Sequence, residues 1–322
     1  MKVHYLILVI TAASFVACQR ASNSSENISN AEISSDSDTT AFPTELVDFY
    51  PISENPVFKG TGIDTWDERI RERGYILKEG DTYHMWYTGY PQTEDRTLYL
   101  GYATSNDGLE WTRYIDNPVF DESWTEDMMV MKLDSTYHMF AEGKNDIAHR
   151  LTSNDRINWT DHGSLNIRYT NALPLSEGPY GTPTAWFENN TWYLFYERGD
   201  LGIWLATSED LEIWTNVQDD PIIEMGPESY DQYGLAVNQI VKYKGWYYAY
   251  YHGTAFEDWR EWSTNVAASK DLVNWVKYRG NPLMGDNKSS GILVHDGVQF
   301  RLYTMHDEVA VHFPKTNQNT EQ

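Results

Sequence analysis

A short aromatic segment returns five times along the 322-residue chain at a nearly constant spacing. The copies begin at Tyr83, Tyr137, Trp192, Trp246 and Phe300, at intervals of 54, 55, 54 and 54 residues. A repeat of this length, built from short aromatic and β-branched strands, is typical of a β-propeller with one four-stranded sheet per repeat. The sequence therefore predicts an all-β fold, a five-bladed β-propeller.

A second motif recurs in register with the first: a serine, an aspartate two residues later, and a tryptophan six residues after the serine. Its four copies begin at Ser105, Ser153, Ser208 and Ser269 and end at Trp111, Trp159, Trp214 and Trp275. Short polar side chains hydrogen-bond the backbone in turns, so the serine and the aspartate predict a turn. The tryptophan then begins an outer strand that packs on the neighbouring blade, as we also expect of Trp86.

The fifth repeat lacks this second motif, because the chain ends soon after 309–313. An unpaired outer edge invites aggregation, and closed propellers usually complete the last blade with a strand from the other terminus. The segment Asn55–Phe58 repeats the four residues Asn117–Phe120 at the end of the first blade. We therefore expect residues near 47–58 to close blade 5.

The amino-terminal end differs from the rest of the chain. An apolar run from Tyr5 to Val16 is too short to span a bilayer comfortably, and it is followed by Cys18, the only cysteine. This pattern resembles a bacterial lipoprotein signal, with residues 1–17 removed and Cys18 lipidated. Residues 18–41 are almost all polar and predict a flexible tether, so that 42–322 form the propeller. We expect an extracytoplasmic protein anchored to a bacterial membrane, in the periplasm or on the cell surface.

Composition excludes several classes of partner and cofactor. The formal charge is −24, from 48 acidic and 24 basic residues, which opposes binding to nucleic acid or anionic lipid. The chain has no paired cysteine motif, no His-Glu-x-x-His and no calcium-loop spacing. It also has no glycine-rich phosphate loop and no dinucleotide fingerprint, so no required cofactor and no metal ligands are expected.

Propeller geometry places two sets of residues around one mouth. The innermost strand of each blade starts on one face, and the second strand ends on that same face. The first set, before the innermost strands, contains Trp66, Asp67, Arg71, Glu72, Arg73, Glu126, Asp127, Glu177, Thr182, Asn238, Gln239 and Lys288. The second set, at the ends of the second strands, contains Thr88, Glu142, Glu197, His252 and His306. Off the repeat, Trp66, Tyr180, Trp259 and Trp262 are the better candidates for ligand contact.

Carboxylates from three successive blades should point into a common funnel. Crowded carboxylates raise one another's pKa, while a neighbouring arginine lowers it. Such an environment separates an acid from a base, as glycoside hydrolysis requires. A single glutamate at a strand end is more often a solvated rim residue, so the prediction depends on this convergence.

At these residues the chain resembles the five-bladed propeller glycosidases of families 43, 32, 68, 62 and 117, over about residues 50–313. In the family 43 pattern a base carboxylate opens blade 1, which implies Glu72 or Asp67 as base and Asp127 or Glu126 as the carboxylate that orients it. Glu177 and the two residues after it look like that family's acid motif, but they stand before blade 3. The resemblance also implies a structural calcium in the central channel, near His252 or His306.

At the blade 4 position where family 43 carries its acid, this chain has Asn238 and Gln239, which cannot donate a proton usefully. The acid then comes from Glu197 or Glu142, or from His252, as a histidine does in family 117. The mechanism is therefore expected to be atypical.

These observations predict a glycosidase that acts on an oligosaccharide or polysaccharide, with inversion. Glu72 or Asp67 would activate water, Glu197 or Glu177 would protonate the leaving oxygen, and Asp127 would hold the base or the sugar. The residues expected to bind substrate are Trp66, Arg71, Arg73, Glu126, Glu142, Thr182, Asn238, Gln239, His252, Lys288 and His306. Arginine and lysine among them make an anionic plant or algal glycan a candidate. The alternatives are a glycan-binding propeller without activity and a glycoside phosphorylase on the same fold.

Overall fold

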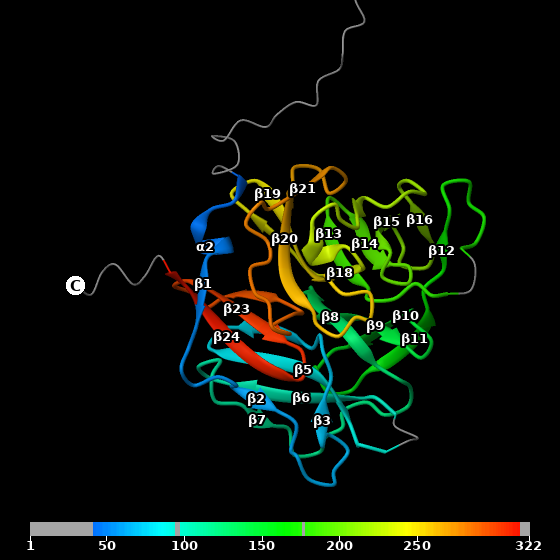
Figure 1. Ribbon diagram of the computed structural model, residues 1–322. Coiled ribbons are helices and arrows are strands. Elements are labelled where there is room, and N and C mark those ends of the chain that lie inside the picture. The colour runs from blue at the N-terminus through cyan, green and yellow to red at the C-terminus, as the bar shows by residue number, and fades with distance from the viewer. Residues whose placement is uncertain (1–40, 94–96, 176–177, 316–322) are drawn as a thin grey trace, which may run out of the picture.

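The computed structural model describes residues 41–93, 97–175 and 178–315, and their strands form five β-sheets around a common axis (Figure 1). Blade 1 comprises β3 (Arg69–Ile70), β4 (Tyr75–Glu79), β5 (Thr82–Tyr90), β6 (Tyr99–Ser105) and β7 (Thr112–Arg113). Blade 2 comprises β8 (Glu126–Leu133), β9 (Thr136–Gly143), β10 (Ile147–Ser153) and β11 (Thr160–Ser164).

The remaining three blades follow the same order from the innermost strand outward. Blade 3 comprises β13 (Thr184–Glu188), β14 (Thr191–Glu197), β15 (Gly202–Ser208) and β16 (Trp214–Asn216), with β12 (Ile167–Arg168) and β17 (Ile223–Glu224) at its edges. Blade 4 comprises β18 (Gly234–Tyr243), β19 (Trp246–Thr254), β20 (Ser263–Ser269) and β21 (Trp275–Lys277). Blade 5 comprises β22 (Ile292–His295), β23 (Phe300–Met305), β24 (Glu308–Pro314) and β1 (Phe49–Pro51), with β2 (Phe58–Lys59) also on β24. The five-bladed propeller is confirmed.

Amino-terminal strands close the last blade, as predicted. β1 pairs antiparallel with β24 through Phe49 and Pro314, and β2 pairs with the other end of β24. The Asn55 side chain accepts a hydrogen bond from Val311 N and donates one to Val311 O, both at 2.8 Å. Asn117 in blade 1 and Asn281 in blade 4 bond the third strands of their own sheets in the same way. The repeated Asn-Pro pair therefore has one structural task in three blades.

The second motif forms the predicted turn and the predicted packing. Ser105 Oγ accepts a hydrogen bond from Gly108 N at 2.8 Å, and Asp107 Oδ1 accepts one from Glu110 N at 2.9 Å. The other three copies repeat these bonds. An aromatic residue of one blade then meets the motif tryptophan of the next blade edge to face, in the pairs Trp86 with Trp159, Phe140 with Trp214, and Phe195 with Trp275. Each such pair contributes about 0.5–1.5 kcal/mol beyond its buried area.

Polar side chains link the innermost strands across the axis. Fully buried Arg73 donates to Asp127 O at 2.6 Å and to Pro183 O at 2.7 Å, and so joins blade 1 to blades 2 and 3. Gln239 exchanges two hydrogen bonds with the main chain of Leu293 and joins blade 4 to blade 5. Arg73 and Gln239 therefore hold the blades together below the mouth, which corrects the expectation that they bind substrate.

Helical structure is limited to α2 (Thr44–Val47) and η1 (Ser229–Asp231) in the described ranges. None of the helices in this part of the chain has the length and apolar character needed to cross a membrane. Cys18 and the predicted tether up to residue 40 lie outside the described residues, as does Glu177.

Candidate active site

The backbone bends in the same way where four of the five innermost strands begin. Arg73, Asp127, Thr182 and Ser290 have φ values of 51°, 47°, 45° and 57°. In blade 4 the pairing of β18 with β19 shifts register between Val237 and Gln239, at the equivalent place. A non-glycine residue in the left-handed region costs free energy, and such residues collect at functional sites. The bend changes the direction in which side chains point at the start of each of these strands, as a β-bulge does.

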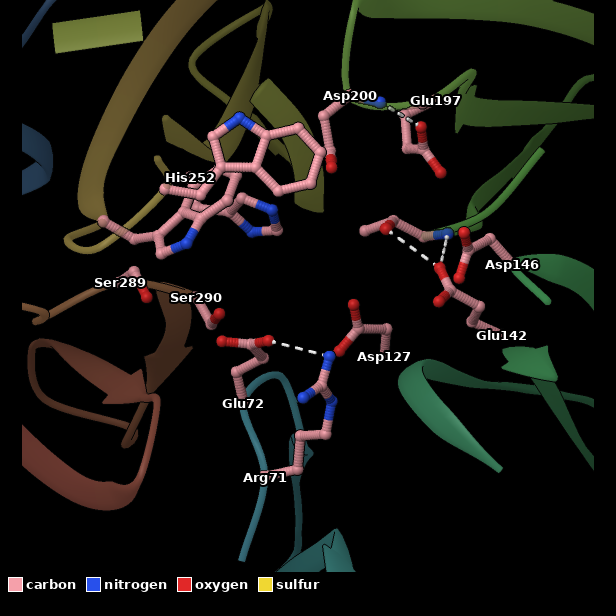
Figure 2. Close-up of a pocket in the computed structure, with 14 residues that line it drawn as sticks. Arg71, Glu72, Asp127, Glu142, Asp146, Glu197, Asp200, His252, Ser289 and Ser290 are labelled. Carbon is pink, nitrogen blue, oxygen red and sulfur yellow. Dashed lines mark hydrogen bonds and ion pairs between the residues drawn. The ribbon is translucent and has the colours of Figure 1, made fainter. Parts of the chain in front are cut away.

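A cavity of about 280 Å³ lies at this mouth (Figure 2). Its wall includes six acidic residues from blades 1 to 3: Glu72, Asp127, Glu142, Asp146, Glu197 and Asp200. Blades 4 and 5 contribute His252, Trp259, Trp262, Ser289 and Ser290. Arg71 is the one lysine or arginine among the described lining residues. The predicted convergence of Glu72, Asp127 and Glu197 on one cavity is thus present.

Glu72 is an ionised carboxylate in this site. His306 Nδ1 lies 2.9 Å from its Oε2, and Arg71 Nη2 lies 3.2 Å from its Oε1. Burial by itself would raise the pKa of Glu72, but the bond from His306 and the charge of Arg71 lower it to about 2. His306 and Glu72 both line an adjoining cavity. Burial by itself would lower the pKa of the His306 imidazole, but the hydrogen bond to Glu72 and the charge of that carboxylate raise it.

The pKa of Asp127 is shifted in the opposite direction to that of Glu72. Its side chain is buried, and its Oδ1 has no hydrogen-bond partner among the described residues. Burial, followed by the charges of Glu72 and Glu126, raises the pKa of Asp127 well above its ordinary value. This shift favours the protonated carboxyl group, which can donate a proton into the cavity.

Glu142 and Glu197 meet at Gly181. Glu197 Oε1 accepts a hydrogen bond from Gly181 N at 2.9 Å, and Glu142 Oε2 accepts one from Thr182 N at 2.8 Å. A Cβ atom on Gly181 would lie 2.1 Å from Glu142 and 2.5 Å from Glu197, so only glycine fits between them. Burial raises the pKa of Glu197, although hydrogen bonds from the Asp200 and Gly181 amides lower it in part. Burial and the charge of Asp127 raise the pKa of Glu142 well above its ordinary value.

His252 lines the cavity as a neutral ring. Burial lowers its pKa to about 3, and its Nδ1 lies 2.9 Å from Asn238 Nδ2. A neutral imidazole is a poor proton donor at the pH where a glycosidase works, so the structure gives His252 no advantage as the acid. Asn238 is buried behind this ring and does not line the cavity, in contrast to the expectation.

Several other expected site residues lie outside the cavity. Trp66 stacks on Tyr87 at 5.8 Å, and the Asp67 carboxylate accepts the Tyr87 hydroxyl at 3.0 Å and pairs with Arg113 at 2.8 Å. The chain forms β3 after Asp67, so it reaches the mouth only at Arg71. Both residues therefore stabilise blade 1, which corrects their assignment to the site.

The expected group of cations is also dispersed. Lys288 pairs with Glu308 at 2.9 Å and does not line the cavity, and Arg73 lies in the axis. Glu126 faces Arg71 from behind, pairs with it, and accepts the Trp124 indole N–H. Tyr180 is buried beside Ile147. These positions correct the substrate-binding roles expected of Lys288, Glu126 and Tyr180, and they remove the basis for an anionic glycan.

Two acidic residues of the cavity were missed in the sequence. Asp146 and Asp200 lie in the hairpins that follow β9 and β14, and each has a φ of 57°. Burial and the neighbouring Glu197 raise the pKa of Asp200 well above its ordinary value. These hairpins follow the second strands on the face where the mouth lies. The short distance in sequence from Glu142 to Asp146 and from Glu197 to Asp200 could therefore have predicted that both aspartates line the cavity. Ser289 and Ser290 stand just before the innermost strand of blade 5, where polar residues at the mouth are expected, and both line the cavity.

The described residues give no support to the calcium ion that the resemblance implies. No group of three or more His, Cys, Asp or Glu side chains in the described part of the chain is arranged to hold a metal. The Arg73 guanidinium crosses the axis at the level of Asp127 and Thr184. A fixed positive charge there opposes a second cation, which prefers six to eight oxygen ligands.

No protein-family model matches the chain. A β-1,2-mannobiose phosphorylase from Thermoanaerobacter sp. (strain X514) is 26% identical over 259 residues, which cover 69% of this chain and 81% of the relative. A 1,2-β-oligomannan phosphorylase from the same organism is 23% identical over 213 residues, which cover 62% of this chain and 70% of that one.

Solved structures show the same architecture. A glycosyl hydrolase from Bacteroides ovatus superposes with a TM-score of 0.67 at 17% identity and covers 85% of this chain and 96% of its own. The β-1,2-mannobiose phosphorylase from Listeria innocua, in complex with β-1,2-mannobiose, gives 0.64 at 16% identity, over 82% and 95%. The chain therefore has a propeller fold with neighbours among both glycoside hydrolases and phosphorylases.

Proposed function

We propose that this chain is a glycoside-processing enzyme that hydrolyses a mannoside, with β-1,2-linked mannose oligosaccharides as the first substrates to test. The relatives and structural neighbours named above support the substrate class. The observation that carries the choice of hydrolysis is that Arg71, the one lysine or arginine among the described lining residues, is already paired with Glu72 and Glu126.

Phosphate is a poor co-substrate for such a cavity. A phosphorylase must hold an anion beside the bond that breaks, which calls for basic groups free to bind it. Arg71 is already paired with Glu72 and Glu126, and Lys288 and Arg73 lie elsewhere. The ionised Glu72 carboxylate would repel the phosphate, whereas water carries no charge. We therefore place water as the acceptor.

Asp127 and Glu197 have the environments of an acid and a base. In the proposed reaction the Asp127 carboxyl group gives its proton to the glycosidic oxygen as the bond from that oxygen to the anomeric carbon breaks. Glu197, in its ionised form, takes a proton from the water that attacks the anomeric carbon. The products are a free reducing sugar and the leaving alcohol, with inversion because water attacks directly.

Glu72 has a different role here from the one expected in the sequence. A carboxylate with a pKa of about 2 is a weak base, so it is poorly suited to activating water. Held by Arg71 and His306, it is a fixed negative acceptor for sugar hydroxyl groups. Burial, with the charge of Asp127, raises the pKa of Glu142 well above its ordinary value, which favours a hydroxyl donor on the opposite wall.

The test is product analysis with and without phosphate. The purified protein is incubated with β-1,2-mannobiose and with a panel of plant and algal oligosaccharides. Hydrolysis predicts free mannose in both conditions, with no dependence on phosphate. Mannose 1-phosphate that forms only when phosphate is present would identify a phosphorylase instead. Binding without any product would identify a glycan-binding propeller.

We also propose the extracytoplasmic, lipid-anchored location predicted from Cys18. Cells expressing the full chain should incorporate a labelled fatty acid into it, and Cys18→Ala should abolish this label and release the protein from the membrane fraction. A label that persists in Cys18→Ala would contradict the anchor.

A further inference from the structure

The cavity beside the catalytic one has the features of a second sugar site. Resting on the proposed function, we infer that this adjoining cavity binds the leaving-group sugar of an oligosaccharide, with the Trp259 indole as its platform. The ligand class is a neutral sugar ring, and the cavity has a volume of about 230 Å³.

The two cavities share a wall. Arg71, Glu72, Trp259 and Trp262 line both of them. A disaccharide with one ring beside Asp127 can therefore reach the second cavity with its other ring by passing Glu72. The fixed Glu72 carboxylate then lies between the two rings, where it can accept hydroxyl groups from either one.

Trp259 is held in an exposed and strained position. It is 45% exposed and has a φ of 53°, in the loop between β19 and β20. A bulky side chain in the left-handed region is an outlier that persists where the surroundings enforce it. Here its Nε1 donates to Tyr233 O and its backbone N to Phe256 O, both at 3.0 Å. The ring is fixed although much of it faces solvent.

A fixed, exposed indole suits an apolar sugar face. Aromatic side chains offer a large apolar surface with little conformational entropy to lose, and ligand sites combine such surfaces with a few polar groups. Trp262 lies 6.0 Å from Trp259 between ring centroids and packs against His252 at 4.9 Å, edge to face. It connects the platform to the catalytic cavity.

The charges of the second cavity favour a neutral ligand. Arg260 pairs with Asp258 at 2.8 Å and lies over the Phe256 ring at 3.6 Å, so its charge already has partners. His306 pairs with Glu72, and the neighbouring Asp307 side chain is 86% exposed. An acidic sugar would meet these carboxylates without a free cation, whereas hydroxyl groups can bond to them.

The experiment measures binding in a variant that cannot turn over substrate. Full-length Asp127→Asn is titrated by calorimetry with mannose and with β-1,2-mannobiose, with and without Trp259→Ala. Because Trp259 lines both cavities, we expect Trp259→Ala to weaken disaccharide binding about tenfold and mannose binding by a clearly smaller factor, and Trp259→Phe to restore most of the difference. Ile115→Ala, an exposed apolar residue that lines neither cavity, is the matched control and should change neither affinity.

Each result is decisive. Equal affinities for β-1,2-mannobiose with and without Trp259, or an equal loss of affinity for both sugars, would overturn the subsite. So would an Asp127→Asn protein that binds β-1,2-mannobiose no more tightly than mannose. The proposed hydrolysis is judged separately, by products of the wild-type protein. If disaccharide affinity depends on Trp259 but the wild-type protein does not hydrolyse the substrate, the subsite is supported and the proposed function is wrong. If the wild-type protein hydrolyses the substrate but disaccharide affinity does not depend on Trp259, the proposed function is supported and the subsite is wrong.

Discussion

The Arg73 guanidinium donates a hydrogen bond of 2.6 Å to the main-chain carbonyl of Asp127. Both residues have left-handed backbone conformations, and the Met128 amide donates back to Arg73 O at 3.2 Å. The arginine therefore fixes the backbone of Asp127 and leaves its carboxyl group free to point into the cavity. Burial lowers the pKa of Arg73 to about 10, so its charge persists at neutral pH.

Replacing Arg73 by methionine should destabilise the protein strongly. The change keeps most of the side-chain volume but leaves Asp127 O, Pro183 O and Thr184 Oγ1 without their buried donor. We expect a loss of about 3–5 kcal/mol in the free energy of unfolding, measured by urea denaturation. Arg69→Met, at an exposed position of β3, should change it by less than about 0.5 kcal/mol. Similar losses in both variants would show that Arg73 has no special structural role.

Asp127→Asn should lose turnover while keeping the fold. An amide cannot protonate the leaving oxygen, so kcat should fall about 10²–10⁴-fold on a natural oligosaccharide. The loss should be much smaller on a dinitrophenyl glycoside, whose leaving group needs no proton. Asp81→Asn, at an exposed turn, is the matched control and should retain full activity. An equal loss on both substrates would argue against Asp127 as the acid.

The pH profile of kcat/KM should be bell-shaped and displaced upward. Activity requires ionised Glu197 and protonated Asp127, and burial raises the pKa of both. The acidic limb should therefore lie above the ordinary glutamate pKa of about 4.3, and activity should fall again as pH rises through the pKa of Asp127. Stopped assays in overlapping buffers check this. A profile that stays flat up to alkaline pH would contradict the assignment of Asp127.

The same buried carboxyl group should limit stability at neutral pH. Below the pKa of Asp127 in the unfolded chain, both states are protonated and Asp127 contributes nothing to the pH dependence. Above it, the unfolded chain ionises while the folded protein stays protonated, so stability falls as pH rises towards the folded-state pKa. Asp127→Asn should therefore be more stable than wild type at pH 7, and the difference should vanish near pH 3. Thermal unfolding at both pH values measures this, and a difference that does not change with pH would refute it.

Gly181→Ala should disturb the two glutamates at once. Its Cβ would overlap both Glu142 Oε2 and Glu197 Oε1. We expect a loss of about 1–3 kcal/mol in unfolding free energy and at least a tenfold fall in kcat, because Glu197 would leave its hydrogen bond to the residue 181 amide. Gly285→Ala, where a Cβ meets nothing within 4 Å, is the control and should behave as wild type. Unchanged kinetics in Gly181→Ala would remove Glu197 from the mechanism.

Much of the architecture follows from periodicity. The 54-residue interval predicted the blade number, the Ser-x-Asp turns predicted the outer strands, and the repeated Asn-Pro pair predicted which segment closes blade 5. Periodicity succeeds here because each blade must present the same contacts to its neighbours. Strand ends are fixed by the same repeat, so Glu142 and Glu197 could be assigned to the mouth.

Adjacent residues before the innermost strands could not be separated in this way. Arg71 and Glu72 line the cavity, Arg73 turns into the axis, and Asp67 faces Arg113. These directions depend on β3 and on the left-handed bend at Arg73, which arise from pairing with β5 and from contacts with blades 2 and 3. No local pattern in the sequence encodes them.

The sequence by itself determined the number of blades, their closure and the face on which polar strand ends collect, because these depend on a repeat that any blade must satisfy. The tertiary structure alone determined the direction in which the pKa of each buried carboxyl group is shifted. Glu72 and Asp127 are both acidic residues near the start of an innermost strand, yet Glu72 pairs with His306 from blade 5, whereas Asp127 Oδ1 has no hydrogen-bond partner among the described residues. Their pKa values shift in opposite directions because burial and partners from distant blades act differently on each.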